Sequence, residues 1–254
     1  MKRGIALLLA LVLMLGMLPV TALADGGTPA GEGTEASPYE IADADDLMAF
    51  AALVNDEGKT RIWGVLTNHI DLTGYDWISI GRTQGKPYSG TFDGRGYSVK
   101  LNINIGADWE SDNAIGLFNT IKNATIRNVR MEGKVTSEEG LGLSLTMGSV
   151  AAFLDRKNTI ENCSSGVEYS LGDTTSGVGG IAGYVFDDGN EIIACANHGK
   201  ITGTCQDDMN AYGGIVGWAD YDITLKYCYN SASIYAPGDG LGYAGGLMGL
   251  SYAA

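Results

Sequence analysis

A block of sequence recurs every 31 to 34 residues through the second half of this chain of 254 residues. It reads GGIAGYV, GGIVGWA and GGLMGL in its clearest copies, and GSVAAFL and IGLFNTI in two weaker ones. The steps are 33, 31, 34 and 32 residues between the equivalent positions Gly116, Ser149, Gly180, Gly214 and Gly246. A period in this range predicts a solenoid, because each repeat buries its apolar face only by stacking on its neighbours.

Each repeat divides into three short β-like runs separated by turn residues. In the repeat that begins at Gly179 the runs are GGIAGYV, EIIACAN and GKITG, and the next repeat gives GGIVGWA, ITLKYCYN and ASIYA. Three strands for each turn of chain predict an all-β parallel β-helix. Its coils hydrogen-bond to each other about 4.8 Å apart, so that every backbone group inside the stack is paired. The glycines permit tight corners and close approach between coils.

Equivalent side chains of successive repeats predict ladders inside this stack. In the second run, two inward-facing sets lie three positions apart, which breaks the two-residue period of a strand and requires a bend between them. Asn128 and Asn162 occupy the bend, and Asn tolerates the left-handed backbone that a bend requires. The first set is Ile126, Ile160, Ile192 and Leu225, and the second is Val129, Cys163, Cys195 and Cys228.

Three of the four cysteines belong to the second set, since Cys163, Cys195 and Cys228 follow the repeat period. In-register parallel neighbours seldom present the torsion that a disulfide needs, so we expect a structural ladder of reduced, buried thiols. Cys205 lies outside this ladder, and its redox state stays open. No CxxC spacing is present, and we expect no metal site and no cofactor.

The N-terminus is typical of a secretory signal peptide over residues 1–24. Lys2 and Arg3 precede an apolar stretch, and Ala22-Leu23-Ala24 provides a small-x-small cleavage site. Pro19 and this site favour cleavage over a membrane anchor. Removal of the two basic residues changes the formal net charge from −14 to −16. We expect a secreted or cell-surface protein with no membrane span after cleavage and, because it is acidic, no affinity for nucleic acid.

Three segments follow the predicted signal. Residues 25–37 are rich in Gly, Pro, Thr and acidic residues and predict a flexible linker. Residues 38–60 contain a predicted amphipathic helix from Ala42 to Val54, with Asp43 or Asp45 as its N-cap. This helix is the natural cap for the first coil of a solenoid, which otherwise exposes its core and an unpaired strand edge. Residues 61–254 are the predicted β-helix.

These blocks resemble the GLUG-motif repeats of large bacterial surface proteins. The segments PYEIADADDLMAFAALVN, LTNHIDLTGYDWISIG and GTFDGRGYSV resemble the lead-in of the same proteins, although His69 and Tyr97 depart from the usual pattern. The resemblance covers roughly Pro38 to the end. It implies a right-handed parallel β-helix with adhesive or structural roles at the cell wall, or an accessory region of a surface peptidase.

Nothing in the sequence predicts catalysis. The HExxH motif of zinc peptidases is absent, and the two histidines, His69 and His198, lie on different coils without a GxSxG motif. Paired carboxylates are harder to exclude, because 30 acidic residues on a stacked surface guarantee some neighbours. We therefore expect no enzyme, and retain a polysaccharide lyase or glycoside hydrolase as the alternative.

Aromatic residues are the candidate ligand-binding groups. A row of aromatics on a flat sheet face can stack on sugar rings or dock a protein, and packing of a loop over the sheet is the alternative interpretation. The function predicted is a non-catalytic adhesin or structural stalk that binds an extracellular glycan or a host or neighbour-cell protein. Because the last repeat begins at Gly245, we expect the coils to continue beyond Ala254. The candidate residues are Tyr184, Trp218, Tyr221, Tyr227 and Tyr229.

Overall fold

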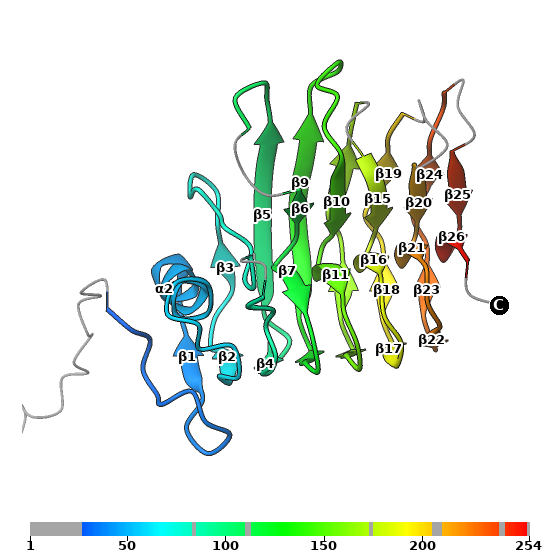
Figure 1. Cartoon of the computed structure of the whole chain (residues 1–254). Coiled ribbons are helices and arrows are strands. Elements are labelled where there is room, and N and C mark those ends of the chain that lie inside the picture. Colours follow the sequence, from blue (N-terminus) through cyan, green and yellow to red (C-terminus); the bar gives the residue numbers. More distant parts are fainter. Residues whose placement is uncertain are drawn as a thin grey trace, which may run out of the picture.

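The computed structural model describes residues 27–82, 85–109, 113–172, 175–204, 210–238 and 242–252. The predicted signal peptide and Cys205 lie outside these residues. The described chain is a parallel β-solenoid of about five turns, with one short helix at its N-terminal end (Figure 1). The predicted fold class is confirmed.

Four parallel sheets run along the stack, where the sequence predicted three strands for each coil. Sheet A contains β1 (Tyr39–Ile41), β2 (Gly64–Leu66), β4 (Thr91–Asp93), β8 (Thr125–Arg127), β12 (Thr159–Glu161), β17 (Asn190–Ile193) and β22 (Ile223–Lys226). Sheet B contains β3 (Ile70–Asp71), β5 (Ser98–Ile105), β9 (Arg130–Ser137), β13 (Ser164–Ser165), β14 (Glu168–Ser170), β18 (Ala196–Asn197), β19 (Ile201–Thr202), β23 (Tyr229–Asn230) and β24 (Ile234–Tyr235).

The other two sheets lie on either side of the repeated glycine block. Sheet C contains β7 (Phe118–Ile121), β11 (Ala151–Leu154), β16 (Ala182–Val185), β21 (Val216–Ala219) and β26 (Met248–Ser251). Sheet D contains β6 (Ala114–Ile115), β10 (Leu145–Gly148), β15 (Thr175–Gly179), β20 (Ala211–Gly213) and β25 (Tyr243–Gly245). The prediction of three strands was wrong because the strands of sheet D precede the Gly pair, which is itself the corner between two sheets.

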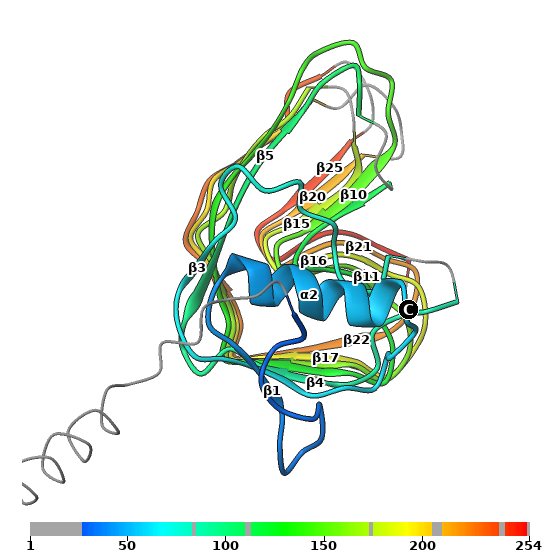
Figure 2. The ribbon, with the colours of Figure 1, turned by 90° about the vertical axis from the view of Figure 1, so that its left-hand side faces the viewer.

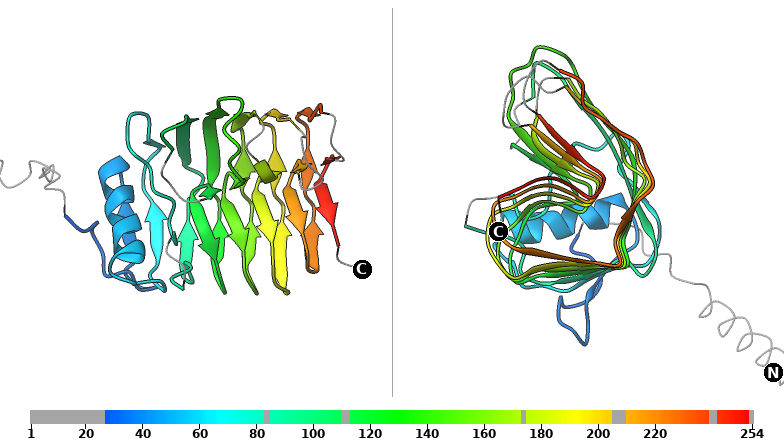
Figure 3. Two further views of the ribbon diagram at one scale, coloured as in Figure 1. Left: turned by 45° about the horizontal axis from the view of Figure 1, so that its top comes forward. Right: turned by 90° about the vertical axis from the view of Figure 1, so that its right-hand side faces the viewer.

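Sheets D and C meet at a sharp corner that points into the molecule, so the cross-section is indented on one side (Figures 2 and 3). The second Gly of the pair makes this corner possible. A Cβ added at Gly180 would lie 2.5 Å from Cγ of Asn197, and one at Gly214 would lie 2.5 Å from Cγ of Asn230. On these two coils the corner therefore reaches across the interior to the Asn side chains of sheet B, and no larger residue fits. One coil earlier the same position is occupied by the buried Ser149.

The last Gly of each block has a separate steric role. A Cβ at Gly217 would lie 2.6 Å from the amide nitrogen of Val178, in sheet D, and one at Gly183 would lie 2.6 Å from Cγ2 of Thr146. Real Cβ atoms essentially never lie this close to other atoms. The missing side chains let sheets C and D approach each other at an acute angle.

The first predicted ladder and the bend are present in the structure. Ile126, Ile160, Ile192 and Leu225 are in-register partners in sheet A. From the coil of β4 onward, the bend between sheets A and B has positive φ, with 49° at Arg95, 56° at Asn128, 51° at Asn162, 52° at Ala194 and 56° at Tyr227. Asn tolerates this left-handed backbone conformation, whereas Ala and Tyr adopt it at a cost in conformational free energy.

The helix α2 (Ala44–Asn55) begins two residues later than predicted and ends one residue later. Asp43 caps it, since its carboxylate accepts a hydrogen bond from the amide of Asp46 at 3.0 Å. Leu47, Phe50 and Val54 are fully buried, and Phe50 lies against the first coils with its ring centroid 5.7 Å from that of Phe92. The helix lies across the N-terminal end of the stack and covers its core (Figure 2).

Residues 27–37 differ from the flexible linker that the sequence predicted. Ala30 forms an antiparallel bridge with Glu40, and the amide of Trp63 donates to the carbonyl of Gly33 at 2.8 Å. The amide of Glu32 also donates to the carbonyl of Ser37 at 2.9 Å. These backbone bonds fix the segment against the first coil, although it has few apolar side chains.

Candidate ligand-binding groove

Sheets C and D meet at an acute angle (Figure 3). Side chains of both sheets line a groove along the outside of this corner. Its hollowed part has a volume of about 320 Å³. Sheet D contributes small side chains and sheet C contributes large ones, so the apolar wall of the groove belongs to sheet C. The lining residues are Asn113, Ser144, Thr146, Phe153, Gly177, Tyr184 and Trp218.

One outward position of sheet C carries a large residue on four of five successive coils. Thr120, Phe153, Tyr184, Trp218 and Leu250 are in-register partners at this position. Phe186 and Tyr252 extend the set. We call Phe153, Tyr184, Phe186, Trp218 and Tyr252 the aromatic face.

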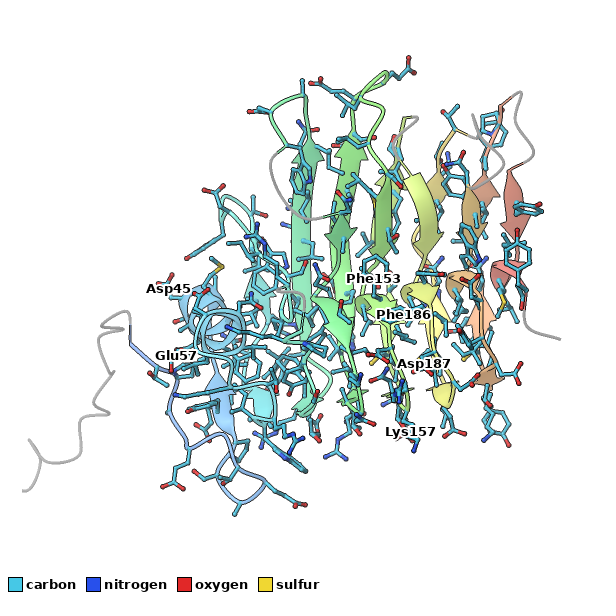
Figure 4. All side chains as sticks on the ribbon, in the orientation of Figure 1. Asp45, Glu57, Phe153, Lys157, Phe186 and Asp187 are labelled. Carbon is cyan, nitrogen blue, oxygen red and sulfur yellow. The ribbon has the colours of Figure 1, made fainter. Side chains whose placement is uncertain are left out.

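The rings of the aromatic face contact one another along the stack. Centroids are 6.0 Å apart for Phe153 and Tyr184, and 6.1 Å apart for Phe153 and Phe186. Tyr184 and Trp218 are 5.6 Å apart, and Trp218 and Tyr252 are 5.9 Å apart. Such edge-to-face pairs are favourable beyond their area of contact. Phe153 and Phe186 lie close together on the face seen in Figure 4.

Asp220 fixes two of these rings in place. Its Oδ1 accepts a hydrogen bond from Nε1 of Trp218 at 2.8 Å, and its Oδ2 accepts one from the hydroxyl of Tyr184. Burial, and then this bond to Asp220, raises the pKa of Tyr184 above its usual value, so the hydroxyl remains a donor at neutral pH. The indole N–H of Trp218 and the hydroxyl of Tyr184 thus both bind one carboxylate. This shared partner holds the two rings in a fixed arrangement.

A larger cleft of about 1080 Å³ adjoins the groove at its N-terminal end. Phe153 lines both hollows, and Phe186 lines the cleft as well. The cleft also has charged residues from four separate parts of the chain, namely Arg61, Arg82, Lys122 and Asp155. Lys122 and Asp155 form an ion pair with Nζ and Oδ2 2.8 Å apart.

The structure brings together only part of the predicted binding set. Tyr184 and Trp218 lie side by side in the groove, although Trp218 is 8% exposed and not the open platform we expected. Tyr221 follows β21 at the edge of this face and is 46% exposed. Tyr227 and Tyr229 lie elsewhere, at the bend between sheets A and B and on β23 in sheet B.

Three residues of the aromatic face were not predicted from the sequence. Phe153 occupies the same place in GSVAAFL as Tyr184 does in GGIAGYV, so alignment of the blocks could have found it. Phe186 and Tyr252 follow the blocks of their coils, outside the segments that we compared.

The three ladder cysteines are free thiols in the structure. Cys163 and Cys195 are buried, and the amide of Cys163 lies 3.4 Å from Sγ of Cys195. The hydrogen bond with Cys163, followed by burial, raises the pKa of Cys195 far above its usual value. Burial also raises the pKa of Cys228, which is partly exposed at the last coil. The thiols of Cys195 and Cys228 are therefore protonated and poorly reactive at neutral pH.

The histidines and the metal-ligating side chains of the described residues are arranged as follows. Among them, no cluster of three or more His, Cys, Asp or Glu side chains has the arrangement of a metal site. His69 and His198 lie on different coils, and each Nδ1 is paired with a serine hydroxyl, Ser98 at 2.9 Å and Ser231 at 2.8 Å. Of the described residues that line the large cleft, Asp155 is the one carboxylate.

Across the described ranges, no helix combines the length and the apolar character needed to cross a membrane. No family model matches the sequence, and the resemblance to GLUG-motif proteins stays a prediction. Halomucin of Haloquadratum walsbyi is 30% identical over 125 residues, which is 42% of this chain and 1% of halomucin. This chain thus spans about a hundredth of that relative.

A solved structure has a similar fold, that of "a putative immunoglobulin A1 protease from Bacteroides ovatus". The TM-score is 0.63 at 20% sequence identity, over 88% of this chain and 76% of the other. At this level of identity the likeness establishes the fold and no activity. The chain is a parallel β-solenoid similar to that protein.

Proposed function

We propose that this chain is a non-catalytic glycan-binding module of an exported bacterial surface protein, an adhesin whose ligand lies along the aromatic face. The observation that supports this proposal is the row of mutually contacting rings on consecutive coils of sheet C. Ligand sites combine a largely apolar lining with a few placed polar groups. Here the rings offer apolar surface for the C–H faces of sugar rings. Polar groups in the lining come from Thr146 of sheet D and from Asn113 and Ser144, which precede strands of that sheet.

The shape of the site favours an elongated ligand. The groove runs parallel to the solenoid axis, and each coil adds one position to it. A chain of sugar residues can therefore contact several coils at once. Because the rings are already fixed by their neighbours and by Asp220, little conformational entropy is lost when a ligand binds.

A glycan array with residues 25–254 tests the proposal, followed by titration of each retained ligand. Phe186→Ala and Phe153→Ala should each weaken binding by roughly 2- to 12-fold, the equivalent of about 0.5–1.5 kcal/mol for one aromatic contact. Tyr227→Ala is the matched control, because that ring is 88% exposed and far from the groove. Equal effects of Tyr227→Ala and Phe186→Ala would contradict the assignment of the groove.

The same ligands should be followed for depolymerisation. Release of shortened or unsaturated oligosaccharides would overturn the non-catalytic proposal and favour a carbohydrate-active enzyme. The absence of a second carboxylate among the described residues lining the cleft supports binding without hydrolysis, since glycosidases generally use a pair.

A second candidate is an accessory region of a larger surface peptidase. It is favoured by the similar fold of the Bacteroides ovatus protein and by the great length of halomucin compared with this chain. In that case the groove would hold a protein substrate for a peptidase domain. Binding of immunoglobulin A1 that survives enzymatic deglycosylation, and that Phe186→Ala abolishes, would favour this role over the glycan adhesin.

A further inference from the structure

A hollow of about 350 Å³ lies over the bend between sheets A and B, and we call it the bend hollow. It faces away from the groove, because the corner between sheets C and D opens on the other side of the cross-section (Figure 2). Amide, guanidinium and hydroxyl groups and one tyrosine ring line it, and none of the described lining residues is an Asp or Glu. The lining includes Asn128, Arg130, Asn162, Ser164, Ala194 and Tyr229.

A row of side-chain amides leads into the bend hollow. Nδ2 of Asn128 donates to Oδ1 of Asp93 at 2.9 Å, and Nδ2 of Asn162 donates to Oδ1 of Asn128 at 2.7 Å. Asp93 is ion-paired with Arg127, so it is a carboxylate and can only accept. The direction of donation is therefore the same along the row, and Oδ1 of Asn162 is left as an acceptor toward the next coil.

Ala194 interrupts this row on the next coil. It has φ of 52°, the left-handed conformation that Asn adopts at the two preceding bends. An Asn at this position would adopt that backbone at a lower cost and could donate to Asn162, and Ala does neither. Residues in costly backbone conformations are concentrated at functional sites, and Ala194 lines the bend hollow. The chain thus gives up stability at the point where the hollow opens.

Two large side chains close the bend hollow along sheet B. The in-register partners there are Arg130, Ser164, Ala196 and Tyr229. The backbones of the two large residues are three coil steps, or roughly 14 Å, apart, and two small residues lie between them. Within the described residues, the guanidinium of Arg130 takes part in no hydrogen bond and no ion pair. Its N–H groups can therefore donate to a ligand.

The ring of Tyr229 is held by a neighbour on the preceding coil. Its centroid is 5.5 Å from that of His198, and Nδ1 of His198 is paired with the hydroxyl of Ser231 at 2.8 Å. Tyr229 is 53% exposed, so much of its ring remains accessible to a ligand. An aromatic ring in this situation offers apolar surface beside a polar lining, which is the combination that ligand sites use.

From these observations, we propose that the bend hollow is a second glycan site, which binds one or two neutral sugar residues. A hydroxyl group is both a donor and an acceptor, so one sugar hydroxyl donates to Oδ1 of Asn162 and another accepts from Arg130. The C–H face of the sugar lies on the ring of Tyr229. This site is distinct from the aromatic face and needs no residue of it. With sites on two sides of the solenoid, one module can join two glycan chains.

Ala194→Asn tests the site, because the new amide can donate to Asn162 and its side chain fills part of the hollow. The probes are neutral tetrasaccharides of glucose, galactose, mannose and N-acetylglucosamine, titrated calorimetrically into residues 25–254. Ala194→Asn should weaken at least one of them by at least about fivefold, and Phe186→Ala should leave the same glycan unchanged. The urea midpoint of Ala194→Asn should be no lower than that of the parent, so that unfolding does not explain the loss.

Tyr229→Ala should weaken the same glycan by roughly 2- to 12-fold. Tyr227→Ala is the matched control, because Tyr227 lies on the same coil, has φ of 56° and is 88% exposed, but does not line the hollow. Equal effects of these two substitutions would overturn the site, and they decide alone if Ala194→Asn unfolds earlier than the parent.

Two other results would also overturn the second site. One is a glycan that Ala194→Asn and Phe186→Ala weaken equally, and the other is a panel in which no glycan responds to Ala194→Asn. If Phe186→Ala still weakens binding in that panel, the aromatic face keeps its proposed function.

Discussion

Replacement of Gly214 by Ala should destabilise the solenoid severely, because this residue forms the corner between sheets D and C. The added Cβ would lie 2.5 Å from Cγ and 2.6 Å from Cβ of Asn230, at least 0.8 Å inside the 3.4 Å of an ordinary contact, and closer still to the carbonyl oxygen of Gly246. Relief of the clash requires movement of Asn230, which donates to the carbonyl of Ala232 at 3.0 Å and accepts from Asn197 at 2.9 Å.

The cost follows from these contacts. Loss of two hydrogen bonds contributes about 2 kcal/mol, and overpacking of a filled interior adds about 1–3 kcal/mol, for a total near 3–5 kcal/mol. At roughly 2–4 °C for each kcal/mol in a chain of this size, the midpoint of thermal unfolding should fall by at least about 6 °C. Circular dichroism at a fixed scan rate measures this shift.

Gly246→Ala provides the matched control on the next coil. Gly246 occupies the same position of its block, but a Cβ there meets no atom within 4 Å. This variant should keep its unfolding midpoint within about 1 °C of the parent, because surface substitutions usually change stability by less than about 0.5 kcal/mol. Equal destabilisation by both substitutions would refute the steric argument, since it would show that the glycines matter for backbone freedom and not for space.

Three further predictions follow from the corners and the polar ladders. Ala194→Asn should raise the free energy of unfolding by about 0.5–1 kcal/mol in urea titrations, because Ala194 has φ of 52° where two earlier coils have Asn; an unchanged or lower value would contradict the cost assigned to that backbone. The hydrogen bond from the hydroxyl of Thr73, then that from Lys100, lowers the pKa of Asp71 to about 2, so Thr73→Val should raise this pKa in an NMR titration. A lowered pKa in the folded state means that this carboxylate contributes stability above its unfolded pKa of about 3.9, and the contribution is lost as the pH falls through about 2. In native-state alkylation followed by peptide mass spectrometry, partly exposed Cys228 should react before buried Cys195, and the reverse order would show that the stack opens at its middle.

The repeat period and the ladders could be predicted because the same physical demand recurs on every coil. An inward position such as that of Ile126, Ile160 and Ile192 must be apolar each time, so its spacing is visible in one sequence. The bend at Asn128 and Asn162 was visible for the same reason, through the left-handed preference of Asn. The helix was predicted to within two residues because its cap and its apolar face are local signals.

The fourth sheet could not be found in this way. Strands such as β20 and β25 have three residues each, AYG and YAG, and these are too short and too rich in small residues to show an alternation. Without sheet D there is no acute corner, and the groove that it forms with sheet C is invisible in the sequence. The cleft was equally hidden, because Arg61 and Lys122 lie 61 residues apart and Arg61 belongs to a coil that does not follow the repeat.

The outward position of sheet C has a consequence for how such a protein changes over generations. Thr120, Phe153, Tyr184, Trp218 and Leu250 occupy one and the same place on five coils, so the frame accepts a polar, an aliphatic or any aromatic residue there. The glycines and asparagines that determine the corner lie on other positions. Under the proposed glycan-binding function, single substitutions at this position can therefore change the ligand preference one coil at a time, while the fold stays the same.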